Sequence, residues 1–172
     1  HRPILLISAL AEHTRNLMTD ARSSLAVVGG APRNVQDAAR VTLVGRFEPF
    51  IPSKQLVSRY LRYQPAAEQY LLLDFSFFRL NIERARYIGG VGKMGWIEQE
   101  DWHKLDLLTS DVEEALLAMG QAMSPAIRLL GIDTYGLDYE VGDRQLRKPF
   151  AKSLRYQDLT KNLPAFLAAI AS

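Results

Sequence analysis

The stretch that decides the fold is PILLISALAEHTRNLMTDARSSL, residues 3–25. The apolar run at residues 4–7 has the length of a buried strand and is too short for an ordinary helix. Residues at helical spacing follow it, and residues 23–28 again have the pattern of a strand. The stretch therefore predicts a strand, a short helix and a second strand.

Polar residues gather at the start of the expected helix. Ser8 is a residue type that caps helices well, and His13 and Thr14 lie three and four positions after Leu10, on the apolar stripe itself. Because the N–H groups at a helix start are unpaired and carry positive potential, a phosphate or carboxylate could bind there. The alternative is that His13 and Thr14 are hydrogen-bonded residues of the core. The pattern alone leaves both interpretations open.

The composition excludes several classes of protein. The 172 residues suffice for one domain, or for a barrel of about 110 residues with a small appendage. The hydrophobic share of 48% is typical of a globular protein. The net charge is +2 with scattered cations, so we expect no nucleic-acid partner. The chain has no cysteine, which excludes disulfides, thiolate metal sites and a cysteine nucleophile. No apolar stretch approaches the roughly 20 residues of a membrane span.

The middle of the chain is predicted to consist mainly of strands. Residues 29–38 have the composition of a loop, and residues 40–50 that of a strand with a bulge at Gly45. A helix is expected to begin at Ser53 and to be interrupted at Pro65. Two more strands are expected at residues 72–82 and 85–90, or one long bent pair over the same stretch.

Three arginines of this region are candidate ligand-binding residues. Arg79 would lie on a sheet face with phenylalanines, where a cation needs an anionic ligand or a salt bridge to Asp74 or Glu83. Arg59 and Arg62 stand beside tyrosines on the expected helix. They either line a site for an acidic ligand or belong to a solvated helix face.

Residues 89–95 read GGVGKMG, and Gly90, Gly92 and Gly95 match the spacing G-x-G-x-x-G. The context of a dinucleotide-binding turn is missing, because no amphipathic helix follows and no alternating strands and helices surround it. A glycine-rich turn between strands is the better interpretation. The acidic residues at 98–101 favour a solvated turn over a metal site.

After a linker at residues 103–110, the chain is predicted to form a helix-flanked set of three strands. We expect a helix at 111–123, strands at 127–132, 135–141 and 145–150, and a last helix that starts at Pro164. This part of the chain contains no catalytic constellation.

Several pieces of sequence carry a family resemblance: LLISALAEHTRNL with DARSSLAVV, ARVTLVGR, RYLRYQPAAEQYLLLDFSFFRL and YIGGVGKMGW. In this order they resemble the haem-utilisation (HugZ/HutZ-type) family of flavin-type split barrels, relatives of pyridoxamine phosphate oxidase. The part after Thr109 resembles a small α/β domain often fused to these barrels. The resemblance implies an α+β fold: an antiparallel split β-barrel over residues 1–104, with its N-terminal strands missing from this chain, and a small α/β domain over 109–172.

The resemblance also implies a cytoplasmic homodimer with its ligand cleft between two barrels. The ligand would be a planar, anionic cofactor: haem, another tetrapyrrole, or the flavin FMN. If the protein is an enzyme, its chemistry would be oxygen-dependent haem cleavage or flavin redox chemistry, supplied by the cofactor. The alternative is a non-enzymatic module that binds a tetrapyrrole or another protein. The cofactor-binding residues implied are Ser8, His13, Thr14, Asn16, Arg22, Arg79 and Lys93.

The chain departs from the family pattern at three places. Its segment LLAMGQAMSP lacks the histidines of relatives, and its end FLAAIAS lacks the histidine that ligates haem iron in some short members. Only His1, His13 and His103 remain as imidazole ligands. Flavin-binding members carry an arginine–lysine pair where this chain has His13-Thr14, and two permanent charges hold a phosphate more firmly. These departures favour weak flavin binding and the non-enzymatic alternative.

Overall fold

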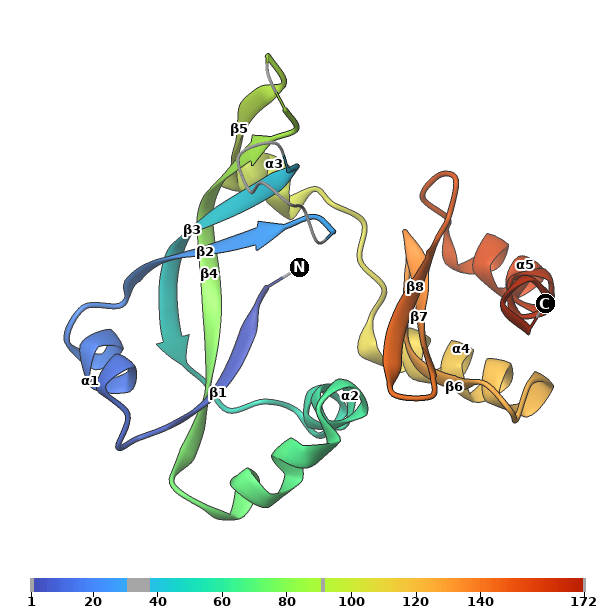
Figure 1. Cartoon of the computed structure of the whole chain (residues 1–172), viewed down its shortest axis with the longest axis horizontal. Helices are drawn as coiled ribbons and strands as arrows, with labels where there is room; N and C mark the ends of the chain where they lie inside the picture. Colours follow the sequence, from blue (N-terminus) through green and yellow to red (C-terminus); the bar gives the residue numbers. More distant parts are fainter. Residues whose placement is uncertain (1, 31–37, 91, 172) are drawn as a thin grey trace. The chain divides into compact units, whose positions relative to one another are not determined.

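The computed structural model describes residues 2–30, 38–90 and 92–171, which form two compact units (Figure 1). The barrel unit comprises His1–Pro52 and Ala67–Leu105, and the C-terminal unit comprises Ser53–Ala66 and Asp106–Ser172. Residues 31–37 of the loop expected at 29–38 lie outside the described residues. None of the helices in the described ranges combines the length and the hydropathy that a membrane span requires.

The barrel unit is a curled, antiparallel five-stranded sheet. Its strands are β1 (Ile4–Ser8), β2 (Arg22–Val28), β3 (Arg40–Pro49), β4 (Phe75–Ile88) and β5 (Met94–Glu98), in the order β1-β4-β3-β2 with β5 also paired to β4. The fourteen residues of β4 pair with β1 over 75–79 and with β5 over 84–88, as its length in Figure 1 shows. This arrangement confirms the predicted antiparallel split barrel. The division into strands at 72–82 and 85–90 is wrong, and the alternative of one long element is the better description, because a single strand runs from Phe75 to Ile88.

Short helices connect the strands of the barrel unit or follow them. Helix α1 (Glu12–Thr19) joins β1 to β2, the 3-10 helix η1 (Pro65–Leu72) precedes β4, and α3 (Gln99–His103) follows β5. The sequence analysis did not predict α3. The core consists of apolar side chains from the inner face of the sheet, with Trp102 of α3 packed against them. Its buried members are Leu43, Phe47, Phe78, Leu80, Ile82 and Ala85.

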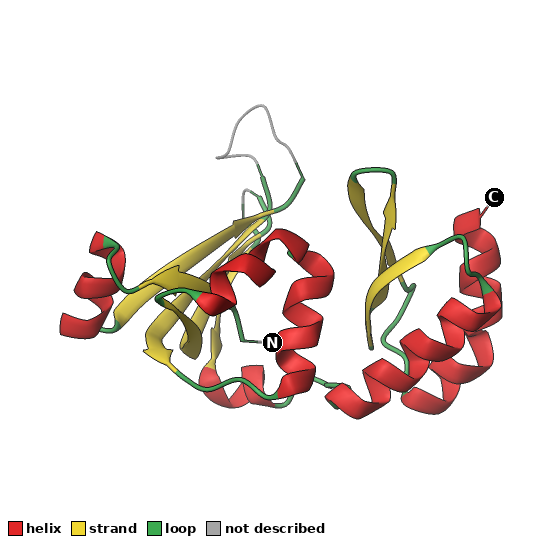
Figure 2. Cartoon of the chain, turned by 90° about the horizontal axis from the view of Figure 1, so that it is seen from below, coloured by secondary structure: helices red, strands yellow, loops and turns green. Residues whose placement is uncertain are grey.

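The C-terminal unit contains a three-stranded antiparallel sheet and three helices. The strands β6 (Arg128–Asp133), β7 (Gly136–Val141) and β8 (Arg144–Pro149) pair in chain order. Helices α4 (Ser110–Met123) and α5 (Tyr156–Ala171) pack on one face of this sheet, and Figure 2 shows them side by side. The leucines of both helices interleave with Leu129, Ile132 and Leu137 in an apolar core.

Helix α2 (Lys54–Tyr63) belongs to the C-terminal unit although its sequence interrupts the barrel. Arg62 donates from Nε to the carbonyl oxygen of Leu130 at 2.8 Å, and Gln145 donates to the carbonyl oxygen of Tyr63 at 2.7 Å. The Tyr63 hydroxyl reaches Asp138 and Gly131, which share the sheet face opposite the apolar core. The helix therefore covers the second face of this sheet.

Helix α5 differs from its expected form. It starts at Tyr156, so Pro164 lies inside the helix and not at its beginning. Proline in a helix interior removes one backbone hydrogen bond. Burial of Leu159, Leu163 and Leu167, each at most 1% exposed, offsets that loss and keeps the helix continuous.

Candidate functional site

The corner between β1 and α1 is held by hydrogen bonds within the protein. The Ser8 hydroxyl donates to Asp74 Oδ2 at 2.9 Å and accepts from the backbone N–H of Leu10 at 3.1 Å. The Thr14 hydroxyl donates to the Ser8 carbonyl oxygen at 2.6 Å and is buried. The N-cap of α1 is Ala11, which makes no side-chain cap bond, so Ser8 stabilises the preceding turn and does not cap the helix.

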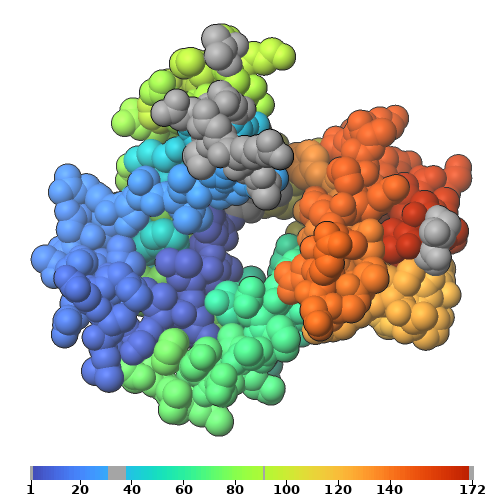
Figure 3. Space-filling view, in the orientation of Figure 1, coloured from blue at the N-terminus to red at the C-terminus, as the bar shows by residue number. Residues whose placement is uncertain are grey.

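His13 and Asn16 lie on the exposed side of α1, whereas Thr14 points inward. The expectation that His13 and Thr14 share the apolar stripe is wrong for His13. It counted from Leu10, but the helix begins at Glu12 and Leu10 lies in the preceding turn with 78% of its surface exposed. The α1 segment, blue in Figure 3, forms part of the molecular surface.

A pocket of about 400 Å³ opens beside this corner within the barrel unit. Thr14 is the only one of the predicted cofactor-binding residues that lines it. Arg15 and Ser76 add a cation and a hydroxyl, and Phe78 and Met18 add apolar surface. The sequence analysis passed over Arg15 because it lies off the apolar stripe of the helix.

Arg22 is neutralised by a near neighbour. Its Nε lies 3.0 Å from Oδ1 and 2.9 Å from Oδ2 of Asp20, and both side chains are exposed. The hydrogen bonds from Arg22 lower the pKa of Asp20 to about 2, and the ion pair raises the pKa of Arg22. Both groups are therefore charged across the physiological pH range, and Arg22 is ion-paired with Asp20 at an exposed position.

Arg79 and Lys93 lie at different places on the barrel. The Arg79 guanidinium carbon is 4.7 Å from the centroid of the Phe50 ring, and its buried Nε has no hydrogen-bond partner among the described residues. No ion pair joins it to Asp74 or Glu83 within that part of the chain. Lys93 is exposed in the turn between β4 and β5.

The glycine-rich segment is a turn, as predicted. The Gly89 N–H donates to the Lys93 carbonyl oxygen at 2.6 Å, and the Lys93 N–H donates to the Gly90 carbonyl oxygen at 3.1 Å. Gly90 and Gly92 have φ values of 116° and 76°, which side chains with a Cβ rarely adopt. Val91 lies outside the described residues.

The C-terminal unit contains an ion cluster that the sequence analysis missed. Glu113 of α4 is 2% exposed, and its Oε2 lies 2.8 Å from Nη1 of Arg59 while its Oε1 lies 3.4 Å from Nη2 of Arg62. The Tyr63 hydroxyl donates to Asp138 Oδ2 at 2.6 Å, and burial and this carboxylate raise the pKa of Tyr63. Arg59 and Arg62 therefore bind a carboxylate of the protein itself.

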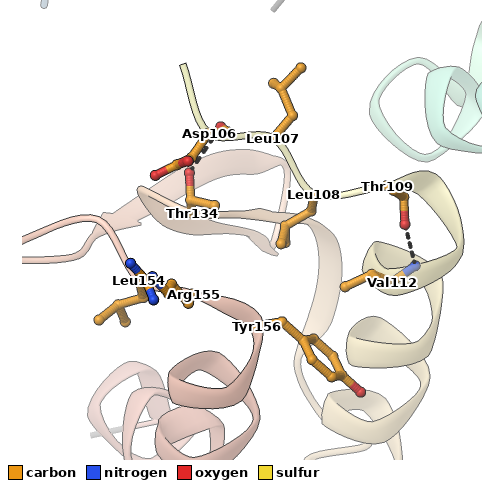
Figure 4. A pocket seen from close by; sticks show the side chains of 9 residues that line it. All are labelled: Asp106, Leu107, Leu108, Thr109, Val112, Thr134, Leu154, Arg155 and Tyr156. Carbon is orange, nitrogen blue, oxygen red and sulfur yellow. Dashed lines mark hydrogen bonds between the residues drawn. The ribbon is translucent and has the colours of Figure 1, made fainter. Parts of the chain in front are cut away.

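A second pocket, of about 260 Å³, lies in the C-terminal unit (Figure 4). Leu108, Val112 and Tyr156 contribute to its walls. At its rim the Thr134 hydroxyl donates to the Asp106 carbonyl oxygen at 3.3 Å. No group of three or more metal-ligating side chains occurs in the part of the chain that the structure describes.

Residues 1–104 match the family model described as CREG, beta-barrel, which is more than half of the 172 residues. The chain belongs to the CREG β-barrel family. No curated protein sequence matches it. The match covers the residues predicted to form a split barrel, and it is consistent with the curled antiparallel sheet.

Two solved structures resemble this CREG β-barrel chain over nearly its whole length. A haem-binding protein from Mycobacterium smegmatis is 27% identical, with 99% of this chain and 81% of that chain covered and a TM-score of 0.55. A protein of unknown function from Agrobacterium tumefaciens is 23% identical, with 96% of this chain and 77% of that chain covered and a TM-score of 0.70. The second likeness shows the fold alone.

Proposed function

We propose that this chain is a CREG β-barrel of the haem-utilisation type that binds haem or a related tetrapyrrole in a cleft between two copies. The observation that carries the proposal is the likeness to the haem-binding protein of M. smegmatis, at 27% identity over 99% of this chain. The family match over residues 1–104 supports a ligand site on the barrel.

The residues around α1 fit an anionic tetrapyrrole. Haem iron takes a neutral imidazole as a strong protein ligand, and His13 is exposed on α1. Arg15, two residues after His13, lines the pocket together with Thr14 and would add positive charge beside the anionic ligand. Lys93 is a further exposed cation. Bound haem supplies oxygen or redox chemistry, while this chain holds and orients it.

Flavin fits the same corner less well. A flavin phosphate is gripped by paired cations, but Arg22 is ion-paired with Asp20. The hydroxyls of Ser8 and Thr14 already donate to acceptors within the protein. We therefore place a tetrapyrrole before FMN as the ligand.

Titration with haemin should give a Soret band in the wild-type protein at micromolar concentrations. We expect the His13→Ala variant to bind haemin at least about tenfold more weakly, because it removes the proposed iron ligand. His103→Ala removes the other described imidazole and is the matched control, with affinity unchanged. Equal affinities of wild type and His13→Ala would contradict ligation by His13, and a yellow FMN complex without a Soret band would replace the tetrapyrrole.

The enzymatic alternative is tested on the same complex. An oxygen-dependent haem-degrading protein should lose its Soret band when a reductant is added in air, whereas a storage or transfer protein should keep it. A flavin-dependent oxidoreductase should instead bleach bound FMN with a reductant.

We expect the protein to be a homodimer in solution. Large apolar side chains are exposed on the barrel unit, including Leu10, Ile51 (97% exposed) and Leu72 (90% exposed). Burying such residues against a second copy would stabilise the pair. Light scattering should give twice the chain mass of 19.4 kDa. A monomer that persists at high concentration would remove the proposed cleft.

A further inference from the structure

The outer face of the barrel sheet presents two arginines and a tryptophan from β4 and β5. The strand register places Arg86 opposite Trp96 and Arg84 opposite Glu98. Residues two apart on a strand share a face, so these four side chains lie on one face. Ala85, between the arginines, is completely buried in the core, which shows that the face of Arg84 and Arg86 is the outer one.

Both guanidinium groups stack on the same indole ring. The Cζ atom of Arg84 is 4.5 Å from the centroid of the Trp96 ring, and that of Arg86 is 5.3 Å from it. Nη2 of Arg86 also lies 3.9 Å from Sδ of Met94. Stacking on an aromatic ring fixes the plane of a guanidinium group and leaves N–H donors at its edge. The two cations are therefore held in place at an accessible surface.

Neither arginine has a carboxylate partner in the part of the chain that the structure describes. In residues 2–30, 38–90 and 92–171 no ion pair includes Arg84 or Arg86, although Glu98 lies opposite Arg84 in the register. Other arginines of the chain, such as Arg22 and Arg147, are bound to aspartates. Two guanidinium groups without a carboxylate partner in the described ranges, carried by residues about 7 Å apart along one strand, create a positive potential that attracts oxyanions.

We infer that this surface, defined by Arg84, Arg86 and Trp96, binds the two carboxylates of a tetrapyrrole whose iron would be held by His13 of the other copy. Within one barrel the two sites are too far apart for one ligand, because eight residues of β4, about 26 Å of strand, separate Ser76 beside α1 from Arg84. The inference rests on the proposed function. A guanidinium fork matches a carboxylate in a bidentate geometry. The surface also offers apolar contacts to the flat ring of a tetrapyrrole. Met94 is 58% exposed and pairs with Ile88, two residues along the strands from the pair Arg86 and Trp96.

Stacked aromatic rings with cations also bind single-stranded nucleic acid. Such sites follow the backbone of several nucleotides along a basic groove, but the net charge of this chain is only +2 and this surface is defined by two arginines, which match two carboxylates. The carboxylate-bearing tetrapyrrole is therefore the better match.

The test is the affinity for haemin of the double variant R84Q/R86Q, measured by Soret titration. We expect affinity to fall about tenfold, the sum of two partly exposed ion pairs. The double variant R144Q/R155Q removes two exposed arginines of the C-terminal unit and should change affinity by less than about twofold. Unchanged far-UV circular dichroism and an unchanged denaturant midpoint show that the variants are folded. Tryptophan emission of R84Q/R86Q is expected to change, because both arginines stack on Trp96.

Esterified ligand identifies the interacting group. The dimethyl ester of iron protoporphyrin should bind the wild type about tenfold more weakly than haemin, and R84Q/R86Q should bind both ligands equally. If wild type binds haemin and R84Q/R86Q binds it as tightly, the inference is wrong and the proposed function stands. If wild type gives no Soret band, both are wrong. A labelled single-stranded oligonucleotide that binds wild type and not R84Q/R86Q, with haemin affinity unchanged, would assign the surface to nucleic acid.

Discussion

Replacing Gly45 by alanine is expected to lower the free energy of unfolding of the barrel unit by about 3 kcal/mol. A Cβ at this position would overlap the carbonyl oxygen of Asn81 and would lie 2.9 Å from its carbonyl carbon and 3.0 Å from Cα of Ile82. These are backbone atoms of β4, which pairs on both edges, so no side-chain rotation can relieve the overlap. The β3–β4 register shifts between Val44 and Gly45, and this bulge brings the two backbones together.

Tryptophan fluorescence during denaturant unfolding reports on this prediction, because both tryptophans, Trp96 and Trp102, lie in the barrel unit. The control is Gly95→Ala on β5, where a Cβ would meet no atom within 4 Å and φ is not positive. We expect that control to change stability by no more than about 0.5 kcal/mol. A Gly45→Ala variant as stable as Gly95→Ala would show that the strands can separate at the bulge without cost.

The strands of the barrel were predictable where their residues follow a local sequence pattern. Alternation in β3 and the glycine at position 45 gave a strand with a bulge, and the register shift at Val44 and Gly45 confirms it. The sequence pattern favoured two strands, 72–82 and 85–90, with the charged residues Glu83 to Arg86 around the junction. In the structure these charges lie along a continuous strand, because Arg84 and Arg86 occupy its exposed face while Ala85 faces the core.

The candidate site was less predictable because its residues depend on where α1 begins. A helix start at Glu12 instead of at Ser8 turns His13 outward and leaves Thr14 facing inward. Arg84 fell between the strands expected at 72–82 and 85–90, so the sequence analysis did not place it on one face with Arg86. The missing information was the partner, since only the pairing of β4 with β5 brings Trp96 beside them.

Contacts between residues far apart in the sequence explain why the sequence analysis missed the ion cluster of the C-terminal unit. Glu113 and Glu114 are neighbours in the sequence, and nothing local distinguishes them. Only Glu113 is buried against Arg59, which lies 54 residues earlier in the chain. Periodicity correctly indicated that residues 54–63 form a helix, but it carries no information about which sheet that helix covers.

Replacing Glu113 by alanine is expected to destabilise the C-terminal unit by about 2 kcal/mol. The carboxylate is 2% exposed and pairs with Arg59 and Arg62, so its loss leaves two guanidinium groups without their anion. A fully buried pair would cost more, but the Arg59 side chain is 40% exposed and can be hydrated. Far-UV circular dichroism should show earlier loss of helix, while the tryptophan transition of the barrel unit provides an internal reference.

The matched control is Glu114→Ala, one residue further on the same helix, which should cost less than about 0.5 kcal/mol. Equal losses in the two variants would show that the ion cluster adds nothing to stability. Gly131 leaves the space that the Tyr63 hydroxyl and Oε1 of Glu113 occupy, because a Cβ at this position would overlap the hydroxyl and lie 3.2 Å from Oε1.

The Glu113→Gln variant separates charge from shape. Burial outweighs the attraction of Arg59 and Arg62 and raises the pKa of Glu113 above its ordinary value. Because the folded state binds this proton more tightly than the unfolded state, protonation of Glu113 stabilises the folded protein. The stabilisation is complete at pH values below the unfolded-state pKa and is lost as the pH rises through the folded-state pKa. As the pH rises from the unfolded-state pKa of Glu113 to its folded-state pKa, the free energy of unfolding of wild type should therefore fall relative to that of Glu113→Gln. Denaturant unfolding at a series of pH values measures this difference. A difference that grows in favour of wild type as pH rises would show instead that the two arginines dominate the carboxylate.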